Sequence, residues 1–159
     1  MRLYSGTSDQ FIQDIRENSI ADIMSNNFQV KFGRAPGYSE MNSWQNSLPR
    51  VRDLLELAGL LDNMVTLEYE VPYNQNRIDC LLFGKGADHS SNIVLIELKQ
   101  WSSVKALEDE GNFVETYTGG VDRVVAHPSQ QVRGYHDYLK SHIQGRSATK
   151  AEATSSGVL

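Results

Sequence analysis

Two carboxylates and a lysine lie on strand candidates that the chain connects by a single loop. Asp79 belongs to the candidate strand 77–83, and Glu97 and Lys99 end the candidate strand 93–99, with seventeen residues between Asp79 and Glu97. Because side chains two apart on a strand share a face, Glu97 and Lys99 point the same way. The loop GKGADHSSN predicts antiparallel pairing of the two strands, which places residues near 79 opposite residues near 97. The two carboxylates are therefore expected to be neighbours.

Partly buried carboxylates that lie this close repel one another unless a positive charge lies between them. A divalent cation is the simplest such charge, and oxygen ligands at this density suit Mg²⁺. Lys99 is expected to reach the same spot, where it can orient or help to deprotonate a metal-bound water. The alternative is a solvated Glu–Lys pair at a strand end, because a three-residue motif alone has little specificity.

The elements that must position these residues begin with two helices. Thr7 and Gln10 form a capping box ahead of an apolar stripe, which predicts an amphipathic helix over residues 8–24. A loop containing Gly and Pro follows, and a long helix begins at Ser39 with apolar residues at spacings of three and four. Pro49 predicts a kink or a break in this second helix.

Strands and a final helix follow. Short connections predict an antiparallel meander of three strands, and the alternating segment 113–125 predicts a hairpin insertion that turns at Gly119-Gly120. A further helix is expected to begin at Pro128. The predicted strands are residues 65–71, 77–83 and 93–99.

This order of elements predicts a fold with both helices and strands, an α/β fold in the broad sense, with α+β order and a mixed sheet. A single domain is expected over residues 1–145. The small polar residues 146–159 are expected to form a flexible tail. After Leu139 the sequence offers no β-branched apolar run for a last core strand. The edge of the third strand is therefore expected to stay open, and pairing with a second copy of the chain is one way to cover it.

Composition restricts the class of protein. The net charge of −5 disfavours a dedicated nucleic-acid binder, but a metal-dependent phosphodiesterase must itself cluster carboxylates. No apolar run approaches the ~20 residues of a membrane helix, and the N-terminus has no apolar leader. The single cysteine, Cys80, cannot form an internal disulfide. We therefore expect a cytoplasmic protein without a membrane partner.

The arrangement of Asp79 and Glu97-Leu98-Lys99 resembles the PD-(D/E)XK nuclease superfamily, whose restriction-endonuclease-like core is a helix, a three-stranded meander, a helix and a last strand. The segments YSGTSDQF, SEMNSWQNSLP and AHPSQQ resemble more closely the nuclease-like domain that precedes Schlafen-like DNA/RNA helicases in bacteria and phages, over most of residues 1–143. Two features depart from the superfamily pattern. Ile78 stands where the motif has proline, and the last core strand is missing.

The resemblance implies further site residues. Glu40, at the start of the long helix, matches the glutamate that often completes the superfamily's metal site, with Glu68 and Glu70 as weaker candidates. Capping explains Glu40 equally well, because an acidic residue is favoured in the first turn of a helix. Gln131 and Tyr135 resemble the Q-x-x-x-Y element of the nuclease domains of bacterial recombination exonucleases, and a polar helix face beside the core is the alternative.

These observations predict a Mg²⁺-dependent endonuclease-like domain that hydrolyses phosphodiester bonds of DNA, with Mn²⁺ as a substitute metal. Asp79, Glu97 and the Leu98 carbonyl are the expected metal ligands, together with Glu40, while Lys99 positions the water. RNA is an alternative substrate, and a helicase or ATPase domain or subunit is the expected partner. The alternative function is a non-catalytic nuclease-like module that binds a partner protein or nucleic acid, which the acidic net charge and the missing strand favour.

Overall fold

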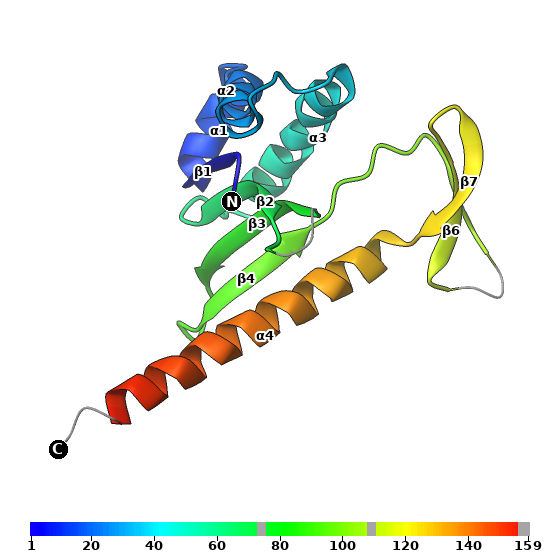
Figure 1. The fold of residues 1–159 in the computed structure, drawn as a ribbon. Helices are drawn as coiled ribbons and strands as arrows, with labels where there is room; N and C mark the ends of the chain where they lie inside the picture. The colour runs from blue at the N-terminus through cyan, green and yellow to red at the C-terminus, as the bar shows by residue number, and fades with distance from the viewer. Residues whose placement is uncertain (73–75, 108–110, 156–159) are drawn as a thin grey trace. The chain divides into compact units, whose positions relative to one another are not determined.

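The computed structural model describes residues 1–72, 76–107 and 111–155, with residues 143–155 as backbone only. The chain divides into two compact units, Met1–Trp101 and Ser102–Leu159. The predicted single domain, residues 1–145, includes the first unit and most of the second. The fold is α+β, and the described residues form four helices and two antiparallel sheets (Figure 1). None of the described helices has the length and apolarity needed to cross a membrane.

The unit Met1–Trp101 is a four-stranded antiparallel sheet with three helices on one face. The sheet order is β1-β2-β3-β4. The strands are β1 (Tyr4–Thr7), β2 (Met64–Glu70), β3 (Arg77–Lys85) and β4 (Ser91–Ile96). The predicted meander is confirmed, but β1 adds a strand that the sequence did not predict, and β4 ends at Ile96 instead of Lys99. Among the described residues of this unit, β4 pairs with β3 alone, so its outer edge is open within the unit.

The helical layer differs from prediction at the first helix. Residues 8–24 form two helices, α1 (Ser8–Arg16) and the start of α2 (Ile20–Phe32), because Asn18 adopts a left-handed φ of 60° between them. α2 also continues into the segment predicted as a loop. The helix α3 (Tyr38–Leu57) continues through Pro49, so of the two predicted alternatives the break is not observed.

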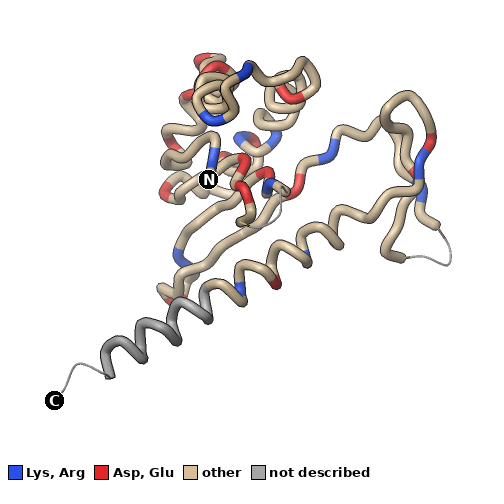
Figure 2. The backbone as a smooth tube through the Cα atoms, viewed as in Figure 1, with Lys and Arg blue, Asp and Glu red and all other residues tan. Residues whose placement is uncertain are grey.

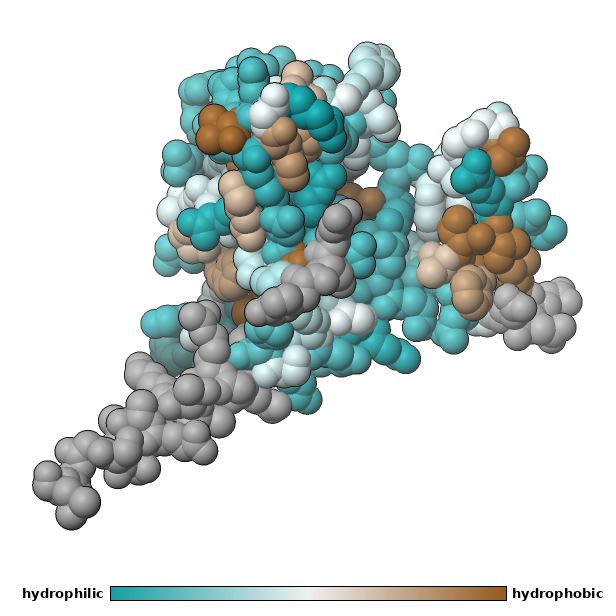
Figure 3. Space-filling view, in the orientation of Figure 1, coloured by the Kyte–Doolittle hydropathy of each residue, from teal (hydrophilic) through white to brown (hydrophobic). Residues whose placement is uncertain are grey.

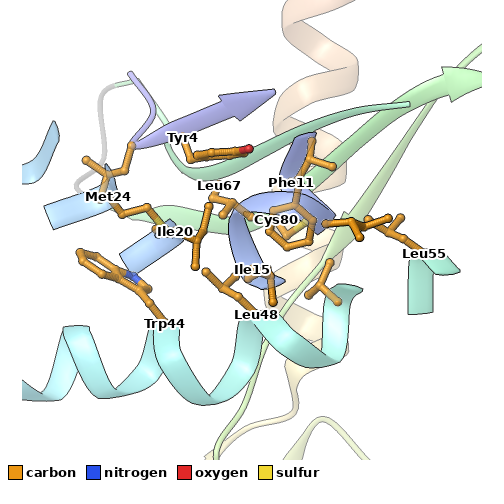
Figure 4. Close-up of a cluster of buried hydrophobic side chains, with 14 of the residues drawn as sticks. Tyr4, Phe11, Ile15, Ile20, Met24, Trp44, Leu48, Leu55, Leu67 and Cys80 are labelled. Atoms are coloured by element: carbon orange, nitrogen blue, oxygen red, sulfur yellow. The ribbon is translucent and has the colours of Figure 1, made fainter. Parts of the chain in front are cut away.

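The core of this unit lies between the helices and the sheet. Side chains of α1, α2 and α3 at helical spacing meet alternate residues of β2 and β3, so each element contributes a single apolar face (Figure 4). Phe11, Met24 and Leu55 are fully buried. Val65 and Leu67 of β2 and Cys80 and Leu82 of β3 form the floor of this core.

The unit Ser102–Leu159 contains the second sheet and the last helix. Strands β5 (Val104–Ala106), β6 (Phe113–Thr118) and β7 (Val121–Ala126) pair in the order β5-β6-β7, and α4 spans Pro128–Ser155. The turn at Gly119-Gly120 and the helix start at Pro128 are confirmed, but β5 makes the predicted hairpin a three-stranded sheet. Most of the predicted tail is helical backbone up to Ser155, and residues 156–159 lie outside the described residues. Apolar side chains of this sheet reach the surface, as Figure 3 shows.

Candidate functional site

The pairing of β3 with β4 brings the two predicted carboxylates together. Cys80 pairs with Ile96, so the next position in this antiparallel register sets Asp79 against Glu97. The Leu98 N–H donates to Asp79 Oδ2 over 2.8 Å, which fixes the carboxylate beside the chain that leaves β4. Asp79 and Glu97 are therefore neighbours, as predicted from the antiparallel pairing of the two strands.

The side chain of Glu97 is enclosed and only partly hydrogen-bonded. Its side chain is 5% exposed, and Oε1 accepts a hydrogen bond from Lys99 Nζ at 2.7 Å. Oε2 is buried and has no hydrogen-bond partner among the described residues. Burial raises the pKa of Glu97 above its ordinary value, against the Lys99 hydrogen bond, which lowers it. One oxygen of a buried carboxylate thus remains available for a ligand.

Asp79 is held in a similar balance. Burial raises the pKa of its carboxyl, while the Leu98 N–H and the charges of Lys99 and Arg77 lower it. The charge of Asp79 in turn raises the pKa of Glu97, as expected of two neighbouring carboxylates. This mutual repulsion is the condition under which a divalent cation stabilises such a pair.

The segment after β4 is hydrogen-bonded to α3, which explains why the strand ends at Ile96 and not at Lys99 as predicted. Gln100 Nε2 donates to the backbone oxygen of Ser43 at 2.9 Å and to Ser47 Oγ at 2.8 Å. These bonds draw residues 97–100 toward the helix and away from a regular ladder with β3. The contacts of Gln100 were not predicted, because a glutamine that follows a strand gives no indication of its partner in the sequence.

Glu40 makes contacts other than those expected of a metal ligand. Its Oε1 accepts from Arg77 Nη2 at 2.9 Å, and its Oε2 accepts from the N–H of Gly37 at 3.2 Å, at the start of α3. Both carboxylate oxygens are therefore engaged by an ion pair and by the helix cap. This pattern agrees with the capping alternative for Glu40, and its role as a metal ligand stays a prediction.

Glu68 lies closer to the candidate site. The register of β2 and β3 places Glu68 opposite Asp79. These two residues do not form a regular pair, because Glu68 has a left-handed φ of 51° that interrupts the strand. Glu68 Oε1 accepts from Trp44 Nε1 at 2.9 Å, and Oε2 lies 3.2 Å from Arg77 Nε. Burial raises the pKa of Glu68, which Arg77 and Trp44 partly offset. The sequence ranked Glu68 below Glu40, since a positive φ in a strand cannot be foreseen from residue type.

A small cavity lies beside Glu68 and Asp79, and its lining does not include Glu97 or Lys99. Its volume is about 50 Å³, enough for an ion or a few waters, and Glu68, Asp79 and Leu98 line it together with side chains of α2, α3 and β2. Acidic and basic residues are interspersed along the backbone of this unit instead of forming one basic face (Figure 2). The acidic residues beside this cavity favour a bound cation, and the mixed charges of the unit do not form a broad basic surface that would bind a polyanion.

The donor set for a metal is small. No three His, Cys, Asp or Glu side chains in the described part of the chain gather in a group that could hold a metal ion. Asp79 and Glu97 with the Leu98 carbonyl remain a chemically suitable set, because Mg²⁺ is commonly held by one or two carboxylates and keeps several waters. The buried, unpartnered Glu97 Oε2 is the observation that fits such an ion.

Gln131 and Tyr135 belong to the unit Ser102–Leu159. They lie four residues apart on α4, where Gln131 is half-buried and Tyr135 is 9% exposed. Their shared helical face is therefore as expected from the spacing, and their contribution to the site stays a prediction.

Comparisons with family models, curated proteins and solved structures found no match to this chain.

Proposed function

We propose that this chain is a metal-dependent nuclease domain that hydrolyses phosphodiester bonds of DNA. The observation that carries the proposal is the buried pair of Asp79 and Glu97, in which Glu97 Oε2 has no partner among the described residues while Lys99 Nζ lies 2.7 Å from Oε1. A buried carboxylate oxygen without a hydrogen bond is costly, so such an atom is retained where a ligand satisfies it. The resemblance to the PD-(D/E)XK superfamily supports the same assignment.

In this proposal Asp79, Glu97 and the Leu98 carbonyl hold Mg²⁺ or Mn²⁺. When bound, the metal supplies a Lewis acid for the phosphodiester and lowers the pKa of a coordinated water. Lys99 orients the attacking water through its ammonium group and offsets the charge that develops on the phosphate. Arg77 helps to keep Asp79 ionised, because its positive charge lowers the pKa of that carboxyl.

The test is cleavage of supercoiled plasmid and of single-stranded DNA and RNA by purified protein, with Mg²⁺, with Mn²⁺ and with a chelator. We expect cleavage with either metal, none with the chelator, and a loss of at least about a hundredfold in Glu97→Gln and Lys99→Met, as is usual for groups that act on the reacting atoms. Lys105→Met is the matched control, since Lys105 pairs with Glu115 at 3.5 Å on the other unit. Undiminished cleavage by Lys99→Met protein would refute the assignment.

A non-catalytic module is the second candidate function. It is favoured by the small donor set and by the engagement of Glu40 with Arg77, which leave two carboxylates for the metal. Calorimetry distinguishes the two functions, because a site kept only for docking need not bind a cation. Binding of Mn²⁺ that Glu97→Gln abolishes supports the enzyme, and no binding at millimolar metal supports the module.

The partners are proposed on the same basis. A helicase or ATPase domain or subunit would supply the nucleic-acid affinity that a chain with a net charge of −5 lacks. The outer edge of β4 could also pair with a second copy of the chain, because an open edge presents unpaired backbone donors and acceptors. Sedimentation at increasing concentration tests this self-pairing, and a monomer throughout argues against it.

A further inference from the structure

A second, larger pocket lies between the three helices of the unit Met1–Trp101. Its volume is about 400 Å³, and its lining comes from the end of α1, the start of α2 and the middle of α3. The candidate nuclease site and this pocket share one lining residue, Trp44. The lining residues are Ile15, Asn18, Ile20, Ala21, Asp22, Trp44, Gln45 and Pro49.

The polar lining of this helical pocket combines the amides of Asn18 and Gln45, which donate and accept, with the carboxylate of Asp22. Asp22 is the only charged residue in its lining, and its side chain is exposed. Pro49 has no backbone N–H, so the carbonyl of Gln45, one turn earlier in α3, lacks its usual helical donor. Gln45 and Pro49 both line the pocket, so we infer that a ligand there can reach this carbonyl. A ligand with N–H donors would satisfy it.

The walls of the helical pocket are apolar and held in place. Ile15, Ile20 and Trp44 are at most 7% exposed and come from three different helices (Figure 4). The Nε1–H of Trp44 donates to Glu68 at 2.9 Å, which fixes the indole plane. A fixed aromatic wall beside an acceptor group is a favourable surface for a cation that carries an apolar chain.

We propose that the helical pocket binds an organic cation, an ammonium or guanidinium group on an aliphatic stem. The positive group pairs with Asp22 and donates to the Gln45 carbonyl, while the stem lies against Ile20 and Trp44. An anion is disfavoured although α2 begins here, because Asp22 in the first turn already complements the positive end of the helix. The cation can be a free amine or a lysine side chain of a partner peptide.

The test uses the fluorescence of Trp44 in a Trp101→Phe variant, which leaves Trp44 as the sole tryptophan. The probes are n-pentylammonium, N-acetyl-lysine amide, and the uncharged n-pentanol as the matched control. We expect a saturable change with at least one cation at millimolar concentration, and a dissociation constant about fivefold weaker for pentanol. Saturation by pentylammonium alone identifies a free amine, and tighter binding of the lysine amide identifies a peptide side chain.

Three variants of the Trp101→Phe protein test the assigned groups. Asp22→Asn removes the carboxylate, and Pro49→Ala returns a backbone donor to the Gln45 carbonyl, so each is expected to weaken cation binding about fivefold. Asp9→Asn, which removes a carboxylate from the first turn of α1 outside the pocket, is expected to bind as its parent does. Calorimetric titration repeats each measurement without the tryptophan signal. No saturable response to either cation, equal binding of pentanol, or undiminished binding by Asp22→Asn would overturn the proposal.

Discussion

Arg77 is the ion-pair partner of two carboxylates, and its removal should destabilise the unit Met1–Trp101. Its Nη2 lies 2.9 Å from Glu40 Oε1 and its Nε 3.2 Å from Glu68 Oε2. We consider Arg77→Met, which keeps an apolar stem in place of the guanidinium. The variant leaves Glu68 in its enclosed position with Trp44 as the remaining hydrogen-bond donor. The consequence is a buried charge without its counter-ion.

The magnitude follows from the burial of the three side chains. Arg77 and Glu40 are each 28% exposed, and Glu68 is 15% exposed. Exposed pairs contribute up to about 1 kcal/mol, and breaking a fully buried pair costs about 3 to 5 kcal/mol. This intermediate burial predicts a loss of about 2 to 3 kcal/mol in the free energy of unfolding at neutral pH. Arg77 Nη1 is a buried donor without a partner among the described residues, so its removal also relieves an unfavourable group. We therefore expect a loss nearer the lower value of this range.

Urea unfolding followed by tryptophan fluorescence measures this loss, because both tryptophans, Trp44 and Trp101, belong to the same unit. Adding Glu68→Gln to Arg77→Met should recover part of the stability, since the more buried of the two carboxylates is then neutral and only the more exposed Glu40 is left without its counter-ion. Glu40→Gln serves as the control and should cost about 1 kcal/mol or less. A loss below about 0.5 kcal/mol in Arg77→Met, or no recovery in the double variant, would refute the reasoning.

The pKa of buried Glu97 is raised, so the folded state binds its proton more tightly than the unfolded state does. Stability of the unit should therefore increase as the pH falls from neutral toward the ordinary glutamate pKa of 4.5, and urea midpoints of Glu97→Gln should depend less on pH in this range. Leu55→Ala should cost about 2 to 5 kcal/mol because the side chain is 0% exposed, whereas Leu54→Ala, at 48% exposed, should cost about 0.5 kcal/mol in the same assay. Gly120→Ala should lower the thermal midpoint followed by circular dichroism, because its φ of 86° suits glycine, at a cost of about 1 kcal/mol. Gly134→Ala, inside α4 with open space around it, should raise that midpoint by stabilising the helix by up to about 1 kcal/mol.

The sequence alone determined the features that depend on neighbouring residues. The pairing of Asp79 with Glu97 follows from two apolar strands joined by one loop, because the hairpin sets the register. The turn at Gly119-Gly120 and the helix start at Pro128 follow from the backbone preferences of those residues. In each case the structural signal and its cause lie within a short segment.

The tertiary structure decided which distant groups join the candidate site. Strand β1 is a short polar segment that pairs because β2 offers it a free edge, as the partnership of Tyr4 with Leu67 shows. The end of β4 depends on Gln100, whose partners on α3 lie more than fifty residues earlier in the chain. Glu40 binds Arg77 and Glu68 turns toward Trp44 only once α3 has packed on the sheet. Contacts of this kind depend on where whole helices and strands pack, and the residue type at one position does not predict that packing.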